Sequence, residues 1–109
     1  MVHGFLSGSA QWQGQVDALS GICDVIGLDL PGFGRNAHMT AIKSIPAFAD
    51  WVSDPLDARS VDRFNLLGHS MGGMIVQEVA HRAGTQLDKL ILYSTGALGV
   101  LPGRFETIA

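Results

Sequence analysis

Three short apolar runs, separated by segments of helical periodicity, constrain the fold of this 109-residue chain most strongly. The runs are residues 23–30, 63–68 and 87–93. Runs of this length that are apolar on both faces are typical of strands in a parallel sheet covered on both sides. Strands that alternate with helices indicate βαβ units with right-handed crossovers. The sequence therefore predicts an α/β chain in three layers, with helices on both faces of a parallel sheet.

Three segments beside these runs repeat apolar residues at helical spacing. Ser9 and Ser44 precede the first two segments as candidate N-caps, and Gly84 follows the third as a candidate C-terminal glycine. Pro46 falls in the first turn of the second segment, where a missing N–H costs nothing, whereas Pro55 is expected to kink or end it. The apolar positions are Trp12, Val16 and Leu19, then Phe48, Val52 and Leu56, then Met71, Met74, Ile75 and Val79.

Composition excludes several classes of protein. Hydrophobic residues make up 47% of the chain and charged residues 16%, a balance that excludes a disordered chain. A net charge of −3 argues against nucleic-acid binding, which needs a basic surface. The single cysteine, Cys23, can form neither an internal disulfide nor a multi-cysteine zinc site. No apolar run approaches the ~20 residues of a membrane span, and the first residues lack a signal-peptide pattern. We expect a cytoplasmic protein without a nucleic-acid or membrane partner.

The motif Gly68-His69-Ser70-Met71-Gly72 carries the strongest chemical signal. It follows a predicted strand and opens a predicted helix, which is the context required for a nucleophile elbow. In such a turn the serine takes a strained backbone conformation and exposes its Oγ, while the glycines let neighbouring backbone pack closely. The N–H of Met71 and the helix dipole then favour a developing oxyanion. The alternative is an ordinary serine N-cap after a glycine turn.

Two further motifs lie near the starts of loops. His3-Gly4-Phe5 follows a short strand at Met1 and Val2, where a second oxyanion donor is expected, and the Phe5 backbone N–H is the candidate. His3 itself is expected to hold this loop rather than to carry a proton. Asp29 ends the run 23–30 and precedes a Pro-Gly turn. Turn chemistry explains Asp29 better than a role as triad acid, because its side chain can accept hydrogen bonds from its own loop.

Together these motifs resemble one family. The chain is similar to the N-terminal half of an α/β-hydrolase-fold protein, in the branch of small esterases, enol-lactonases, cofactor-free haloperoxidases and carbon–carbon bond hydrolases. The resemblance covers nearly the whole chain and departs from the common pattern at Asn36, where many relatives carry Ser. The matching residues are His3-Gly4-Phe5, Trp12, Asp29-Leu30-Pro31-Gly32-Phe33-Gly34 and Gly68-His69-Ser70-Met71-Gly72-Gly73.

The resemblance implies a site and a reaction. Ser70 is implied as the nucleophile, and the backbone N–H groups of Phe5 and Met71 are implied as the oxyanion hole. The implied substrate is a small-molecule ester or lactone that passes through an acyl-serine, and no cofactor or metal is implied. Residues 1–95 would form a truncated hydrolase core, and residues 96–109 would begin a cap. The binding residues expected from the motifs are His3, Gly4 and His69.

The general base and acid of this reaction are missing from their family positions, which would lie beyond Ala109. The histidines of this chain are His3, His38, His69 and His81, and none stands where the family's base stands. A serine hydroxyl is a weak nucleophile without an adjacent base. We therefore expect a serine hydrolase of the α/β-hydrolase family as the parent activity, with this chain alone inactive or nearly so.

Other activities stay open at this stage. A non-catalytic hydrolase-like module that binds a partner or small ligand is the alternative from another class. Haloperoxidase chemistry or carbon–carbon bond hydrolysis as the parent activity uses the same nucleophile. Epoxide hydrolases and haloalkane dehalogenases are disfavoured, because those relatives carry Asp where Ser70 stands.

The family's strand order predicts an incomplete sheet of about four strands. The short strand at Val2 would lie between the runs 23–30 and 63–68, and the run 87–93 would be outermost. That apolar edge, together with a mean hydropathy of +0.25, predicts self-association as a homo-oligomer through the exposed edge or apolar faces.

Overall fold

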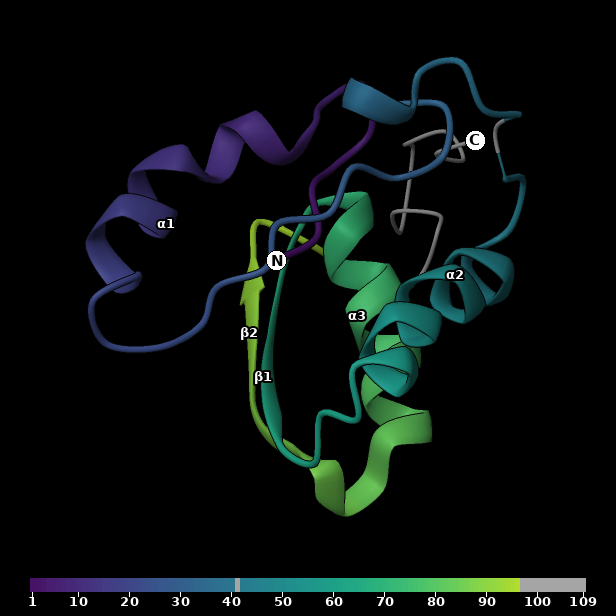
Figure 1. The fold of residues 1–109 in the computed structure, drawn as a ribbon. Coiled ribbons are helices and arrows are strands. Elements are labelled where there is room, and N and C mark those ends of the chain that lie inside the picture. Colours follow the sequence, from purple (N-terminus) through teal and green to yellow (C-terminus); the bar gives the residue numbers. More distant parts are fainter. Residues whose placement is uncertain (41, 97–109) are drawn as a thin grey trace.

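The computed structural model describes residues 1–40 and 42–96 (Figure 1). Four helical elements come first, and strands and helices alternate only from Phe64 onward; most of the chain before the first strand is loop and short helix. In chain order they are the 3-10 helix η1 (Ser9–Trp12), α1 (Gln13–Leu19), the 3-10 helix η2 (Gly34–Asn36), α2 (Ile45–Ala58), β1 (Phe64–His69), α3 (Met71–Ala83), the 3-10 helix η3 (Gly84–Gln86) and β2 (Leu87–Tyr93). The α/β class predicted from the alternation is confirmed.

The sheet is parallel, as expected, but it is smaller than predicted. β1 and β2 form the two-stranded ladder, and α3 is the crossover between them. Val2 extends this sheet by single parallel bridges to Gly68 on one side and to Leu28 on the other. The order of the expected strands is therefore confirmed.

The expectation of about four strands was wrong. The run 23–30 contributes only the bridge at Leu28, whose N–H donates to the Met1 carbonyl at 3.2 Å. Val2 alone cannot propagate a ladder, so the first residues of this run meet no partner strand in residues 1–40 and 42–96. The Cys23 N–H instead donates to the Leu19 carbonyl at 3.0 Å, which continues the end of α1, and the Cys23 side chain is exposed.

The helix boundaries follow the predicted signals with two exceptions: Pro55 does not end its helix, and Ser9 is not a cap. Ser44 caps α2, because its side chain accepts from the Ala47 N–H at 3.2 Å, and α2 continues past Pro55 to Ala58. Gly84 ends α3 with φ of 59°, a conformation that favours glycine. Ser9 is not an N-cap, because it lies inside η1 and its hydroxyl donates to a carboxylate in another loop.

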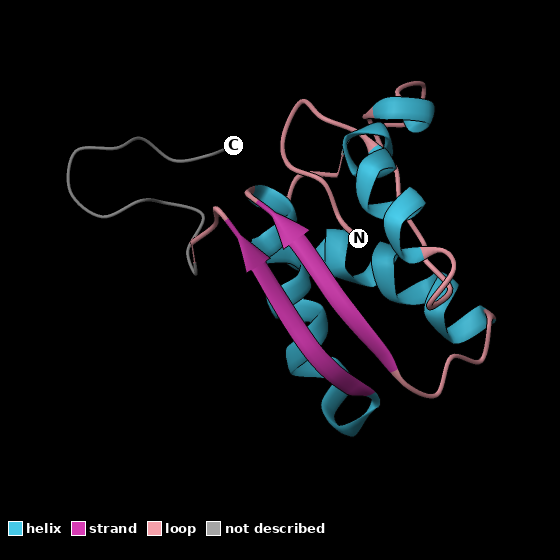
Figure 2. Cartoon of the chain, turned by 90° about the vertical axis from the view of Figure 1, so that its left-hand side faces the viewer, coloured by secondary structure: helices cyan, strands magenta, loops and turns pink. Residues whose placement is uncertain are grey.

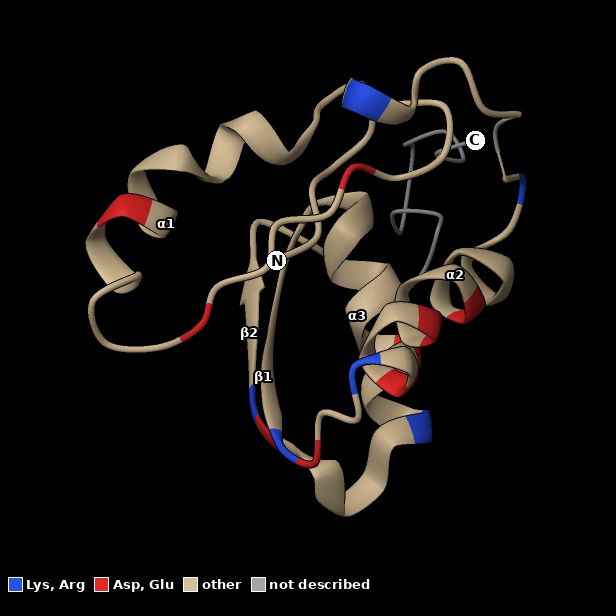
Figure 3. Cartoon of the chain, viewed as in Figure 1, with Lys and Arg blue, Asp and Glu red and all other residues tan. Residues whose placement is uncertain are grey.

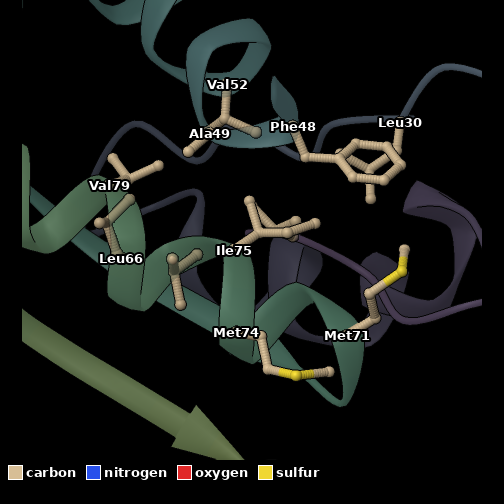
Figure 4. Packing of buried hydrophobic residues seen from close by; sticks show 11 residues of the cluster. Leu30, Phe48, Ala49, Val52, Leu66, Met71, Met74, Ile75 and Val79 are labelled. Carbon is tan, nitrogen blue, oxygen red and sulfur yellow. The ribbon is translucent and has the colours of Figure 1, made fainter. Parts of the chain in front are cut away.

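The core lies between β1 and the two long helices (Figure 4). α2 buries one face and presents its aspartates on the other, as Figure 3 shows. α3 is buried on its glycine-rich first turns as well as at its apolar positions. Burying one Val, Leu or Ile side chain contributes about 1.5–3 kcal/mol, so this layer dominates the stability of the fold. The buried cluster comprises Val2, Leu30, Phe48, Ala49, Val52, Leu66, Met71, Met74, Ile75, Val76 and Val79.

The two faces of the sheet differ in how they are covered. α2 and α3 lie on one side, and Figure 1 places α1 on the other. However, no α1 residue is buried, and Figure 2 shows no helix in front of β1 and β2 on that side. Leu90, Ile91, Leu92 and Tyr93 are consequently 36–59% exposed. The third layer is present but does not cover the strands.

The proposed cap segment, residues 96–109, lies outside the described residues apart from Gly96. Among the residues described, no helix is long and apolar enough to cross a membrane.

Replacement of Ile75 by Ala tests where the stability resides. Ile75 is fully buried in α3, so Ile75→Ala is expected to lower the free energy of unfolding by about 2–5 kcal/mol through lost burial and a residual cavity. Chemical denaturation followed by circular dichroism measures this. Ile22→Ala is the matched control, because Ile22 is 81% exposed and its loss is expected to change stability by less than about 0.5 kcal/mol. Equal effects of the two substitutions would contradict the assignment of the core.

Candidate active site

Ser70 occupies the turn between β1 and α3 in a strained conformation. Its φ is 55° and its ψ is −119°, a region that L-residues rarely adopt and that costs on the order of 1–3 kcal/mol. Two hydrogen bonds to the backbone of Ser70 hold this turn. The Ser70 N–H donates to the Tyr93 carbonyl at 3.2 Å, and the Thr95 hydroxyl donates to the Ser70 carbonyl at 2.5 Å. These hydrogen bonds therefore fix the backbone of Ser70 in its strained conformation.

Three glycines around Ser70 make this turn possible, because backbone or side chains occupy the place of each missing Cβ. A Cβ on Gly68 would overlap the Gly72 carbonyl, and a Cβ on Gly72 would overlap the carbonyl of Val2. A Cβ on Gly73 would overlap the Thr95 side chain. The sharp turn thus brings the start of α3 directly against the first residues of the chain.

The loop that begins at His3 lies against the serine. A Cβ on Gly4 would lie 3.0 Å from the Ser70 Cβ and 3.2 Å from the His69 carbonyl oxygen. Phe5, whose N–H is the candidate oxyanion donor, is the next residue. Met71 is the first residue of α3, so its N–H is one of the donors at the helix start that have no partner within the helix. The two candidate donors therefore come from the segments that flank Ser70.

The Ser70 hydroxyl is not used by the helix start. Its side chain makes no capping hydrogen bond to α3, and the residue is half-buried. This distinguishes it from an ordinary serine N-cap, whose hydroxyl accepts from the second or third N–H of the helix. The alternative interpretation of the motif as a simple cap is therefore not supported by the geometry.

His3 is fully buried and holds two backbone segments together. Its Nε2 accepts from the Leu30 N–H at 2.9 Å, and its Nδ1 lies 2.8 Å from the Gly4 carbonyl. A carbonyl can only accept, so Nδ1 carries the proton and the ring is neutral. Burial lowers the pKa of His3, and the bond to Gly4 and the nearby Asp29 charge offset this only in part. These contacts fit a histidine that holds its loop.

Asp29 does not face the serine. Its carboxylate accepts from the Ser9 N–H and the Ser9 hydroxyl, both at 2.8 Å, and from the Arg35 N–H. Burial raises the pKa of Asp29, but the hydrogen bonds from Ser9 and Arg35 lower it further, so the net pKa lies below its ordinary value. The bond from Arg35 is the expected one from its own loop. The bonds from Ser9, twenty residues earlier, were not predicted.

His69 lies in an aromatic cluster beside the turn. Its ring is 5.0 Å from that of Tyr93 and 6.4 Å from that of Trp12, measured between centroids, and its Nδ1 lies 3.2 Å from Nε2 of Gln11. Trp12 is buried, and its Nε1 has no hydrogen-bond partner among the described residues. These side chains thus contact one another around His69, the residue before Ser70.

No general base is evident within the described part of the chain. His3 is held by backbone, His69 contacts Gln11, and the remaining two, His38 and His81, are exposed on a loop and on α3. No hydrogen bond joins any of these histidines to the Ser70 hydroxyl in residues 1–40 and 42–96. Within the same ranges, no three His, Cys, Asp or Glu side chains gather as metal ligands would.

Sequence reasoning missed the residues that hold the site from behind. The Thr95 hydroxyl donates a hydrogen bond to the Ser70 carbonyl, and the Ser9 hydroxyl donates one to the Asp29 carboxylate. Phe33 places its ring edge-on to both His3 and Phe5, with centroids 5.7 and 5.6 Å apart. The Pro-Gly turn indicated that this loop bends sharply. No pattern in the sequence indicated which loop it would meet, since that contact joins distant residues.

Comparison with known proteins identifies the family. A family model described as alpha/beta hydrolase fold matches residues 1–108. The chain belongs to the alpha/beta hydrolase fold family. An uncharacterized protein of Mycobacterium tuberculosis (strain ATCC 25618 / H37Rv) is 32% identical over 98 residues, which are 90% of this chain. Those residues are only 29% of that relative, so this alpha/beta hydrolase chain spans less than a third of its length.

Solved structures of alpha/beta hydrolases superpose on the same region. A thermophilic esterase from Thermogutta terrifontis matches with a TM-score of 0.81 and 30% identity, over 93% of this chain and 38% of its own. An N-acyl homoserine lactonase matches with a TM-score of 0.78 and 25% identity, over 91% of this chain and 37% of its own. The predicted resemblance to this family, with esterases and lactonases among its members, is confirmed.

Replacement of Gly72 by Ala tests the close packing of the turn. The new Cβ would overlap the Val2 carbonyl, which is backbone and cannot rotate away. Gly72→Ala is therefore expected to lower the free energy of unfolding by at least the upper part of the ~1–3 kcal/mol range of overpacked sites. Gly14→Ala is the control, because nothing lies within 4 Å of that position in α1. A Gly72→Ala chain as stable as the Gly14→Ala chain would refute the geometry of the turn.

The neutral, buried His3 predicts a pH dependence of stability. Its pKa is lower in the folded chain than in the unfolded chain, so the unfolded state binds more protons. The free energy of unfolding is therefore expected to fall as the pH drops below about 6.5, the ordinary value for histidine. Urea titrations at pH values from about 8 to about 5 measure this.

A matched pair of variants isolates the histidine. Burial also lowers the pKa of the Met1 amine, to about 6, so the informative quantity is the difference between the unchanged chain and each variant. His3→Gln removes the titrating ring and is expected to flatten the pH dependence. His81→Gln, at an exposed position of α3, is expected to leave it intact. The assignment fails if both variants keep the full dependence.

Proposed function

We propose that this chain carries the nucleophile and the oxyanion hole of a hydrolase that cleaves small carboxylic esters or lactones through an acyl-serine. The observation that supports this most is the strained Ser70, with φ of 55° between β1 and α3 and a hydroxyl that makes no capping bond. A side chain with no structural use, held at a cost in free energy, is typical of a functional position.

The reaction divides between side chain and backbone. The Ser70 Oγ attacks the carbonyl carbon and loses its proton to a general base, while the carbonyl oxygen becomes an oxyanion. The N–H groups of Phe5 and Met71 donate to that oxyanion, and the start of α3 adds its dipole. The C–O bond to the leaving group then breaks as the protonated base gives its proton to the departing oxygen, which leaves as an alcohol. Water hydrolyses the acyl-serine, which restores the Ser70 hydroxyl and releases the acid.

The proposed substrate class rests on the relatives. The T. terrifontis protein is an esterase, and the N-acyl homoserine lactonase opens a cyclic ester. An ester and a lactone present the same kind of carbonyl carbon to a serine nucleophile. Phe5, which is 49% exposed beside the candidate site, is consistent with an apolar substrate group near the carbonyl.

The lack of a general base among the described residues sets an upper limit on the rate of ester hydrolysis expected of this chain. Without a base, an oxyanion hole and binding leave a residual acceleration of about 10³–10⁴ over water. We expect turnover of a p-nitrophenyl ester to lie within that limit and to change little in Ser70→Ala, because this acceleration does not need the serine. A fluorophosphonate is expected to modify Ser70 slowly and specifically, as mass spectrometry of the digested chain would show.

Controls separate the two parts of this prediction. Ser44→Ala removes the cap of α2 and is expected to keep both the turnover and the modification of Ser70. Modification of the same segment that persists in Ser70→Ala would refute Ser70 as the nucleophile. A turnover number of about 1–10³ s⁻¹, as typical enzymes have, would instead refute the expected lack of activity. Specific binding of esters with no modification of Ser70 would favour the non-catalytic module.

We also propose that the chain self-associates through β2. Among the described residues no strand pairs with the outer edge of β2, and Leu90, Ile91 and Leu92 on this strand are 36–48% exposed. In Figure 3 the charged residues of β2 gather at its start, so the apolar end lacks the charges that usually protect an edge. A two-fold pairing of β2 with a second copy would pair the backbone of this edge.

Replacement of Leu92 by Lys tests this association. A charge on the edge is expected to block strand pairing, so Leu92→Lys is expected to sediment as a monomer while the unchanged chain forms dimers or larger species. Ile22→Lys, at a loop residue that is 81% exposed, is the control and is expected to keep the association. An unchanged chain that stays monomeric in light scattering at micromolar concentration would refute the proposal.

A further inference from the structure

One carboxylate joins two loops behind the candidate site. Asp29 Oδ1 accepts from the Ser9 N–H and Oδ2 accepts from the Ser9 hydroxyl, both at 2.8 Å. The Arg35 N–H donates to the same carboxylate, and the Asp29 carbonyl accepts from the Asn36 side chain at 2.5 Å. Asp29 therefore links the loop that begins at Gly4 with its own turn at residues 31–36.

The backbone of both loops closes tightly around this carboxylate. A Cβ on Gly8 would lie 3.1 Å from Asp29 Oδ1, and a Cβ on Gly34 would overlap the carboxylate. Gly34 also has a φ of 52°, which favours glycine. Two glycines thus leave space for one charged group. An ordinary turn aspartate would need only its own loop, so this packing indicates a role between the loops.

The loop held by Asp29 is the one that contains the candidate oxyanion donor. Residues 4–9 are fixed at one end by Gly4, which lies against Ser70, and at the other by Ser9. Inside this segment the Ser7 N–H donates to the Gly4 carbonyl at 3.3 Å. Phe5 lies between the two anchors. Its ring packs edge-on against Phe33, which belongs to the second loop that Asp29 holds.

We propose that Asp29 is a positioning residue for the oxyanion hole: it fixes residues 4–9 so that the Phe5 N–H faces the oxygen that develops at Ser70. This inference rests on the proposed function. Asp29 acts through Ser9 and the 31–36 turn and touches no reacting atom. Hydrogen bonds from N–H groups to an ionised carboxylate are stronger than those between neutral groups, so they suit the fixing of a donor.

The rate at which Ser70 is modified tests this role. Asp29→Asn keeps the shape of the side chain but replaces one acceptor oxygen with an amide nitrogen that cannot accept from Ser9. The rate constant for modification by a fluorophosphonate is expected to fall about 10- to 100-fold, because a displaced oxyanion donor loses much of its effect. Ser9→Ala removes only the hydroxyl bond and is expected to lower the rate constant about fivefold. Asp24→Asn, at an exposed position near the start of the run 23–30, is expected to leave it unchanged.

The form of the result distinguishes positioning from folding. A purely structural role would lower the fraction of chains that become modified and would leave the rate constant of the folded chains unchanged. An Asp29→Asn chain with an unchanged rate constant therefore overturns the proposal. A lowered rate constant at full extent of modification, graded from Ser9→Ala to Asp29→Asn, supports it.

A second measurement does not depend on the reactivity of Ser70. Amide hydrogen exchange is expected to speed up about tenfold or more at Ser7 and Ser9 in Asp29→Asn, with amides of β1 and α3 unchanged. If Ser70 of the unchanged chain resists modification, the proposed function fails in this chain, and exchange alone decides the role of Asp29. Unchanged exchange at Ser7 and Ser9 would then overturn the inference.

Discussion

The close approach of α3 to the first residues of the chain is the constraint on which the rest of the structure depends. Gly68 and Gly72 permit it, because carbonyl groups fill the space that their side chains would need. The approach lets Val2 pair with Gly68 and extend the sheet, and it brings Gly4 against Ser70. A single side chain at either glycine would separate the strand, the helix and the loop at once.

This constraint explains why the candidate site is built mainly from backbone. Both proposed oxyanion donors are N–H groups, and the conformation of Ser70 is held by Tyr93 and Thr95 through its own backbone. Side chains hold the loops that carry these backbone groups. His3 and Asp29 each bond to backbone of two different segments and so fix the loops from behind. Strain of about 1–3 kcal/mol at one serine is sustainable because the buried layer of α2, α3 and β1 greatly exceeds it.

The sequence predicted those features that arise from local patterns. The caps at Ser44 and Gly84 and the sharp turn at Ser70 each depend on residues within a few positions, and the structure contains all three. The prediction for residues 23–30 was wrong because an apolar run becomes a strand only beside a partner, and Val2 offers a single bridge. Ser9 was misassigned for a related reason, since its hydroxyl bonds to a carboxylate twenty residues away.

The sequence by itself determined that this chain forms parallel βαβ units of the alpha/beta hydrolase kind, with a serine in a glycine-rich turn between strand and helix. Periodicity and glycine spacing carry that information, because both act over short stretches of chain. Only the tertiary structure decided that Asp29 would meet Ser9, that Thr95 would brace Ser70, and that one face of β2 would lie open. Those outcomes depend on which distant segments pack together, and packing is a property of the folded whole.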